Sequence, residues 1–194
     1  MAFLKTKSKS GRPGNADALL RCLLVVCIFV TGHAVTMQGQ TIDEDQVKAA
    51  FLFNFAKFIT WPATTPNGPP ATLEICVAGA DSIADALKIA TKGKSIDSRQ
   101  VVIQKVDSAV GLQTCQILYI GDQTRRTLEI LAIAAKHPIV TVGEDDRFIR
   151  RGGMINFVPS DGRLRFEINV DAASRSGIVI SSKLLQVARV VHDQ

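Results

Sequence analysis

The sequence has few of the residues from which catalytic and metal sites are built. Only 3 of its 194 residues are histidine, and no serine stands in the G-x-S-x-G turn that presents a hydrolase nucleophile. His137 precedes a proline and His192 stands near the end of the printed sequence, so neither belongs to a cluster with ligand spacing. We therefore expect no catalytic residues, no metal and no cofactor.

Long apolar runs are absent as well. An apolar run of eight residues extends from Leu23 to Val30, far short of the roughly 20 residues that cross a bilayer as a helix. Basic residues precede this run and small residues follow it up to Ala34, which is the plan of a secretory signal peptide. We predict that residues 1–34 are a signal peptide cleaved near Ala34 and that residues 35–194 form one exported domain. A permanent anchor is the alternative.

The excess of positive charge belongs mostly to this leader. The whole sequence has 23 Lys and Arg against 18 Asp and Glu, and residues 1–34 hold five of the bases and one of the acids. The predicted mature chain therefore has 18 bases against 17 acids, a net charge of +1. Such a chain lacks the basic stripe that binds a nucleic-acid backbone, so we expect no nucleic-acid partner.

Cysteine is scarce, and half of it lies in the leader. Removal of the leader would leave Cys76 and Cys115, an even number in a compartment that permits disulfides. A bond between them would close a loop of about 39 residues and stabilise the fold by roughly 3 to 4 kcal/mol. Two buried free thiols are the alternative.

The order of predicted elements is that of an α/β domain. Apolar residues at helical spacing predict a helix from Ile42 to Ile59, and Thr41 with Glu44 has the capping-box spacing. Strands are predicted over 73–78, 100–106, 116–120 and 138–142, and helices over 82–90 and 123–136. Strands that alternate with helices of this length imply a mostly parallel sheet with helices on both faces.

The last third of the chain has a different pattern. Two predicted strands, 153–158 and 163–170, flank a turn with Asp161 and Gly162, which indicates an antiparallel hairpin at an edge of the sheet. Apolar residues at helical spacing predict a final helix over 181–191.

The aromatic residues of the first helix are candidates for a protein contact. One helical face would take Phe51, Phe55 and Phe58 into the core, so we expect Phe53 to point away from it, with Trp61 beyond the helix end. Aromatic side chains dominate binding energy at protein interfaces. The candidate partner-binding residues are Phe53, Phe55, Phe58 and Trp61. Core packing is the alternative.

A second set of candidates suits a small ligand. Gly121 and Asp122 follow a predicted strand, at the carboxyl end where open α/β sheets bind ligands. Arg163 and Arg165 offer anion contacts on a later strand. Ordinary loops and a solvated strand face explain the same residues.

Several segments together resemble the YfiR family of periplasmic proteins, also called YfiR/HmsC-related. They are VKAAFLFNFAKFITWP at 47–62, LEICVAG at 73–79, CQILYIGD at 115–122, GGMINF at 152–157, LRFEIN at 164–169 and SSKLLQVARVV at 181–191. The resemblance implies a Rossmann-like domain without enzymatic activity, often a homodimer. It places Cys76 and Cys115 at the positions of a shared structural disulfide. The second cysteine pair of the relative that names the family is missing here, so a redox switch at that pair is not implied.

The resemblance also implies a function and partners. The namesake of the family holds an inner-membrane diguanylate cyclase inactive by binding its periplasmic portion, which lowers cyclic-di-GMP and biofilm formation, and an outer-membrane lipoprotein can sequester it. We predict a periplasmic regulatory binding protein that represses such a cyclase or a sensor kinase. A periplasmic small-molecule sensor or carrier is the alternative.

Overall fold

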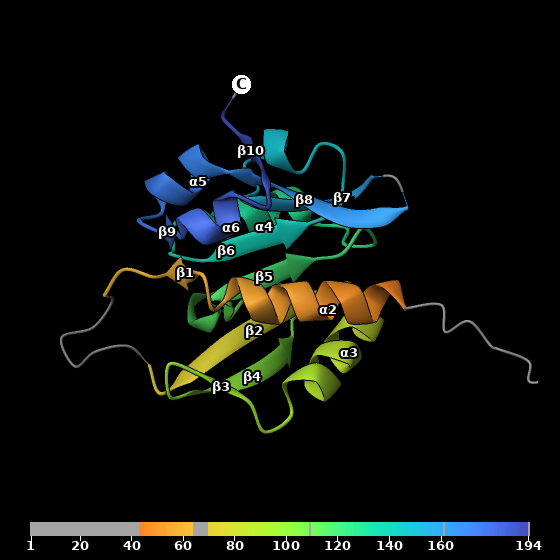
Figure 1. Cartoon of the computed structure of the whole chain (residues 1–194), viewed down its shortest axis with the longest axis vertical. Coiled ribbons are helices and arrows are strands. Elements are labelled where there is room, and N and C mark those ends of the chain that lie inside the picture. The colour runs from red at the N-terminus through yellow and green to blue at the C-terminus, as the bar shows by residue number, and fades with distance from the viewer. Residues whose placement is uncertain (1–42, 64–69, 109, 161, 194) are drawn as a thin grey trace, which may run out of the picture. The chain divides into compact units, whose positions relative to one another are not determined.

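The computed structural model describes residues 43–63, 70–108, 110–160 and 162–193 (Figure 1). The predicted signal peptide and Thr41 lie outside these ranges, so the signal peptide stays a prediction. Within the described ranges, no helix combines the length and apolar character that crossing a membrane requires.

The first described helix, α2 (Glu44–Phe55), begins at a different cap from the predicted one. The carboxylate of Asp43 accepts a hydrogen bond of 3.1 Å from the backbone N–H of Asp45 and so satisfies a free donor of the first turn. The helix is also shorter than predicted. After Phe55 the chain enters a two-residue strand, β1 (Ile59–Thr60), which pairs antiparallel with β9 (Val179–Ile180).

The main sheet has eight strands in the order β10-β8-β7-β6-β5-β2-β4-β3. Their bounds are β2 (Thr72–Ala78), β3 (Ser95–Ile96), β4 (Arg99–Lys105), β5 (Ile117–Ile120), β6 (Val140–Gly143), β7 (Ile155–Ser160), β8 (Arg163–Asn169) and β10 (Arg189–Val191). All neighbouring pairs are parallel except β3 with β4 and β7 with β8. The predicted mostly parallel sheet and its antiparallel hairpin are confirmed.

Helices cover both faces of this sheet. They are α3 (Asp81–Thr91), α4 (Thr127–Ala134), α5 (Val170–Arg175) and α6 (Ser182–Leu185), with 3₁₀ turns η1 (Leu112–Thr114) and η2 (Ile149–Arg151). Leu73, Ile75 and Val77 of β2 pack with α2 and α3, whereas Cys76 and Ala78 pack with α4 on the other face. This gives the Rossmann-like three-layer arrangement (Figure 1).

The predicted final helix over 181–191 is wrong in its second half. Helix α6 ends at Leu185, and Arg189–Val191 instead forms β10, which pairs parallel with β8. The two valines of β10 are β-branched and favour extended backbone. The backbone of β8 provides hydrogen-bond partners for β10. The hairpin β7–β8 therefore does not form the edge of the sheet, because β10 lies outside it.

Candidate partner-binding site

The aromatic residues of the first helix are mostly core residues. Phe53 keeps only 7% of its surface exposed and Phe55 1%, so the expectation that Phe53 points away from the core is wrong. The reason is that α2 packs against α3 as well as against the sheet, so two sides of the helix are buried. The ammonium groups of Lys57 and Lys94 lie 4.4 and 5.2 Å from the ring centroid of Phe53.

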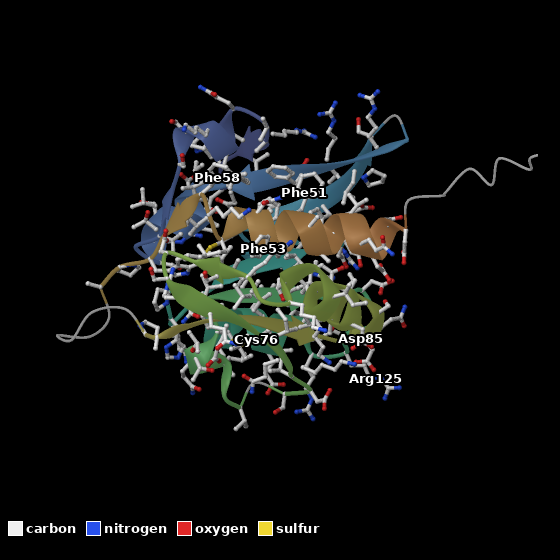
Figure 2. All side chains as sticks on the ribbon, turned by 60° about the horizontal axis from the view of Figure 1, so that its bottom comes forward. Phe51, Phe53, Phe58, Cys76, Asp85 and Arg125 are labelled. Carbon is white, nitrogen blue, oxygen red and sulfur yellow. A yellow bond between two sulfur atoms is a disulfide. The ribbon has the colours of Figure 1, made fainter. Side chains whose placement is uncertain are left out.

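Four rings form the part of the core between α2 and the hairpin. Phe55 lies 5.0 Å from Phe166 and 5.9 Å from Phe157, measured between ring centroids, and Phe51 lies 5.5 Å from Phe166. These separations are those of attractive edge-to-face and offset aromatic pairs. Phe51 and Phe58 remain half-buried (Figure 2). Phe55 therefore lies in the core and not on a contact surface.

Trp61 is, with Phe58, one of the two candidates that the structure leaves partly accessible. It follows β1 and is half-buried. Its indole Nε1 donates a hydrogen bond of 3.1 Å to the backbone oxygen of Gln116, and the guanidinium of Arg99 lies 5.8 Å from the ring centroid. The hydrogen bond thus fixes one edge of the indole ring, and the guanidinium of Arg99 lies near its π system.

Trp61 lines a groove of about 480 Å³ at the amino ends of the central strands. Its walls include apolar and polar groups: Ile59, Thr60, Trp61, Pro62, Ala63, Pro70, Asp97, Arg99, Gln113, Cys115, Gln116, His137, Pro138 and Ile139. A fixed aromatic ring among prolines, with an arginine beside it, suits a partner's apolar side chain next to a carboxylate. We call this the Trp61 groove.

The predicted disulfide is present and contributes to this groove. Cys76 of β2 and Cys115 are bonded, their Cα atoms lie 5.8 Å apart, and both are buried. Cys115 itself lines the Trp61 groove and precedes Gln116, the acceptor of the indole hydrogen bond. The disulfide therefore fixes the backbone to which Trp61 is tied.

The small-ligand candidates do not come together in one site. A Cβ atom at Gly121 would lie 2.7 Å from the carbonyl oxygen of Gly79, and the hydroxyl of Thr124 donates to Ala78 O at 3.0 Å. The chain's own backbone therefore leaves no room for a ligand directly at Gly121. Asp122 beside it is exposed.

The two arginine candidates lie elsewhere in the sheet. Arg163 and Arg165 are exposed on β8, which β7 and β6 separate from β5 and its loop. At a spacing of about 4.8 Å between strands, three steps are roughly 14 Å. A small ligand at Gly121 would not reach them.

A buried polar network lies under α2, and no motif in the sequence predicts it. Tyr119 is fully buried, and its hydroxyl donates a hydrogen bond of 2.7 Å to Glu144. Lys48 of α2 is ion-paired with Glu144 and with Glu44, the latter at 2.8 Å. In the sequence Glu144 stands in an acidic loop run, so only the fold shows that it links α2 to the end of β6.

This network shifts the acidity of its members. Burial, followed by the hydrogen bond with Glu144, raises the pKa of Tyr119 far above its ordinary value. Burial lowers the pKa of Lys48, but hydrogen bonds with Glu144 and Glu44 and their charges outweigh it, so the pKa is raised overall. Tyr119 therefore stays neutral and Lys48 charged at every physiological pH. Among the residues that the structure describes, no group of three His, Cys, Asp or Glu side chains is placed to hold a metal ion.

Comparison with known proteins identifies the family to which this chain belongs. Residues 45–189 match the model of a family described as YfiR/HmsC-like. The crystal structure of a conserved domain protein from Vibrio cholerae is similar at a TM-score of 0.45 and 14% identity, over 60% of this chain and 54% of that one. The chain thus spans about half the length of that structure. Because the family model covers most of the sequence, the chain belongs to the YfiR/HmsC-like family.

Proposed function

We propose that this protein is a periplasmic regulator that binds the periplasmic portion of an inner-membrane diguanylate cyclase or sensor kinase and represses it. Membership of the YfiR/HmsC-like family supports this role. The disulfide is consistent with an oxidising compartment. By holding the cyclase inactive, the protein lowers cyclic-di-GMP and biofilm formation.

The observation that carries the proposal is the half-buried Trp61 in its groove. A tryptophan whose indole N–H is already bonded to Gln116 loses little conformational freedom on binding. Large aromatic anchors in preformed grooves provide most of the binding energy at many protein interfaces. The Trp61 groove is therefore the surface that contacts the membrane partner.

Repression then works by a shift of populations. A partner with active and inactive conformations moves toward the one that the regulator binds more tightly. An outer-membrane lipoprotein that binds the regulator withdraws it from the cyclase by mass action. No chemical step at the regulator is required.

Trp61→Ala is expected to weaken binding of the partner about 30-fold, since truncation of an aromatic anchor costs about 2 kcal/mol. In a strain that lacks the gene, the cyclic-di-GMP level should rise. Expression of the wild-type protein should lower it again to the original level, and expression of the variant should not. Leu128→Ala, at an exposed residue of α4, serves as the matched control and should restore the wild-type level. An unchanged cyclic-di-GMP level in the deletion strain would remove the proposed function.

One observation favours a second candidate function, that of a small-molecule sensor or carrier. The Trp61 groove, at about 480 Å³, is within the size range of ligand pockets. Calorimetry with nucleotides and amino acids separates the two functions. A compound that gives binding heat with the wild-type protein but not with Trp61→Ala would support the sensor function. If no compound gives binding heat, only the regulatory function remains.

A further inference from the structure

The charges of the described part of the chain are distributed unevenly. Residues 43–146 contain 10 Lys and Arg and 13 Asp and Glu, whereas residues 147–193 contain eight bases and four acids. The second set forms η2, the hairpin β7–β8, α5, α6 and β10, at one edge of the sheet. A net charge of +4 is thus concentrated at that edge, against −3 in the rest of the described fold.

The strand pattern directs much of this charge to one face. In β8, Phe166 and Ile168 are buried in the core under α2, so Arg163 and Arg165 point to the opposite face. The register places Arg189 of β10 beside Glu167, with an ion pair of 2.9 Å. We call the arginines Arg150, Arg163, Arg165, Arg175 and Arg189 the basic face.

A groove of about 710 Å³ lies within the basic face. Strands β8 and β10 contribute Glu167, Arg189 and Val191 to it, η2 contributes Arg150, and α5 contributes Arg175. Both charged side chains, the carboxylate of Asp146 among them, and apolar side chains such as Ile149 reach this groove.

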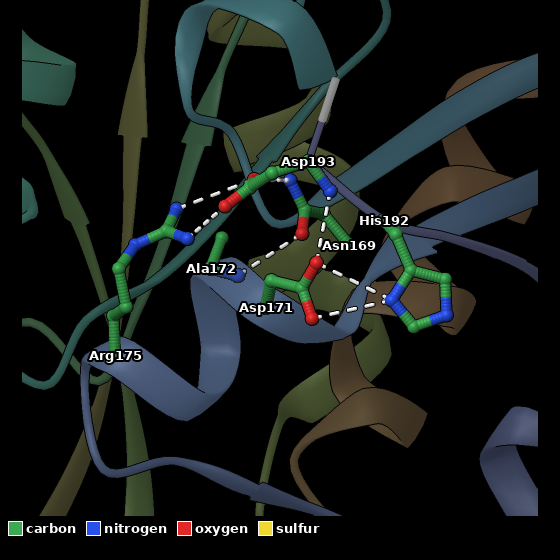
Figure 3. Close-up of polar contacts among 6 residues, drawn as sticks. All are labelled: Asn169, Asp171, Ala172, Arg175, His192 and Asp193. Carbon is green, nitrogen blue, oxygen red and sulfur yellow. Dashed lines mark hydrogen bonds and ion pairs between the residues drawn. The ribbon is translucent and has the colours of Figure 1, made fainter.

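The last described residues hold one wall of this groove in place. The carboxylate of Asp193 accepts hydrogen bonds from the guanidinium of Arg175 and from Asn169 Nδ2, the latter at 2.9 Å (Figure 3). The backbone N–H of Asp193 donates a hydrogen bond of 2.9 Å to the carboxylate of Asp171. The Nδ1 atom of His192 lies 3.2 Å from that Asp171 carboxylate. These contacts give the groove a fixed shape.

The arginines of the basic face divide into two groups. Arg175 and Arg189 are paired with Asp193 and Glu167. Within the described ranges, no carboxylate lies within ion-pair distance of Arg150, Arg163 or Arg165. The first group keeps the groove in shape, and the second is available to an anionic partner.

We propose that the basic face binds an extended acidic segment of a protein partner, aligned with the edge strand β10. In the described part of the sheet β10 is the last strand, so one of its edges has no neighbouring strand. Val187 and Val190, with 64% and 43% of their surfaces exposed, provide apolar contacts beside that edge. Uncommitted arginines provide the complementary charge.

The same observations disfavour other anionic partners. Asp146, Glu167 and Asp193 line the groove between the arginines, so a continuous polyphosphate would meet repulsion that spaced carboxylates avoid. The groove is concave, whereas the headgroups of a bilayer present a flat surface. An edge strand pairs with extended polypeptide, which lipid cannot imitate.

The test uses a fluorescent ten-residue peptide of alternating glutamate and valine, with a lysine–valine peptide of equal length for comparison. Fluorescence anisotropy should show that the acidic peptide binds the wild-type protein and the basic one does not. Arg163→Glu with Arg165→Glu should weaken binding by ~10-fold or more, because two attractions become repulsions. Hydrogen exchange at Arg189–Val191 should slow when the peptide is bound.

The matched control applies the same change of charge elsewhere. Arg125→Glu with Arg126→Glu alters two exposed arginines before α4, and Figure 2 shows Arg125 far from the ribbon of the hairpin. This double variant should leave binding within about twofold, since exposed charges beyond a Debye length are screened. Equal weakening by both double variants would overturn the proposal in favour of nonspecific attraction. Binding to phosphatidylglycerol vesicles without binding to the peptide would overturn it in favour of a membrane surface.

Discussion

Replacement of Cys76 and Cys115 by alanine is expected to lower the free energy of unfolding by about 4 kcal/mol. The disulfide joins residues 39 positions apart, and loop-entropy arguments assign a closed loop of that length about this much stabilisation through restriction of the unfolded chain. Both sulfurs are buried, so the substitution also leaves small voids. Urea unfolding of the purified protein, followed by circular dichroism, measures the change.

Reductant provides the control for this variant. Dithiothreitol should lower the stability of the wild-type protein to near that of the double alanine variant, and should leave the variant itself unchanged. A stability loss below about 1 kcal/mol would mean that packing around β2 and β5 holds the fold without the bond, in contrast to the loop-entropy estimate.

Phe55→Ala is expected to destabilise the fold by about 4 kcal/mol, the usual range for a fully buried phenylalanine being 3 to 5 kcal/mol. The ring is 1% exposed and contacts Phe51, Phe157 and Phe166, so its removal opens a cavity between α2 and the hairpin. The measurement is again the midpoint and slope of urea unfolding.

The contrast with Trp61→Ala separates a core role from a binding role. Phe55→Ala should reduce partner binding only in proportion to the folded fraction, whereas Trp61→Ala should abolish repression at nearly full stability. Ile89→Ala, at a side chain that is 80% exposed on α3, should change stability by less than about 0.5 kcal/mol. A Phe55→Ala protein of wild-type stability would place that ring outside the core.

Much of the fold follows from local pattern. The strands over 73–78 and 100–106 and the hairpin are found within one or two residues of the predicted positions. β-Branched runs and turn residues define such elements without information from distant parts of the chain. The pairing of Cys76 with Cys115 was implied by the family resemblance and is confirmed.

Other features depend on neighbours that no local pattern identifies. If α2 had a single buried face, Phe53 would be exposed. Because α2 also packs against α3, a second face of the helix is buried, and Phe53 lies on it. The segment at Arg189–Val191 has a helical pattern with Leu184 and Leu185, yet the free edge of β8 captures it as a strand. Tertiary context overrides weak propensity in both cases.

The Trp61 groove could be predicted only in part. The sequence identifies Trp61 as a candidate, but its companions Arg99, Gln116 and His137 come from three separate segments. Their meeting depends on the order of strands in the sheet and on the disulfide, and neither is encoded in residue spacing. The basic face likewise depends on strand register, which places Arg189 beside β8.

The short ribbon formed by β1 and β9 has a kinetic consequence. It joins Ile59 to Ile180, so it closes one of the longest loops in the chain. Contacts so distant in sequence carry a high entropy of closure and form late in folding. Trp61 follows this ribbon directly, so a partly folded chain lacks the formed Trp61 groove, and this surface is completed only in the last stage of folding.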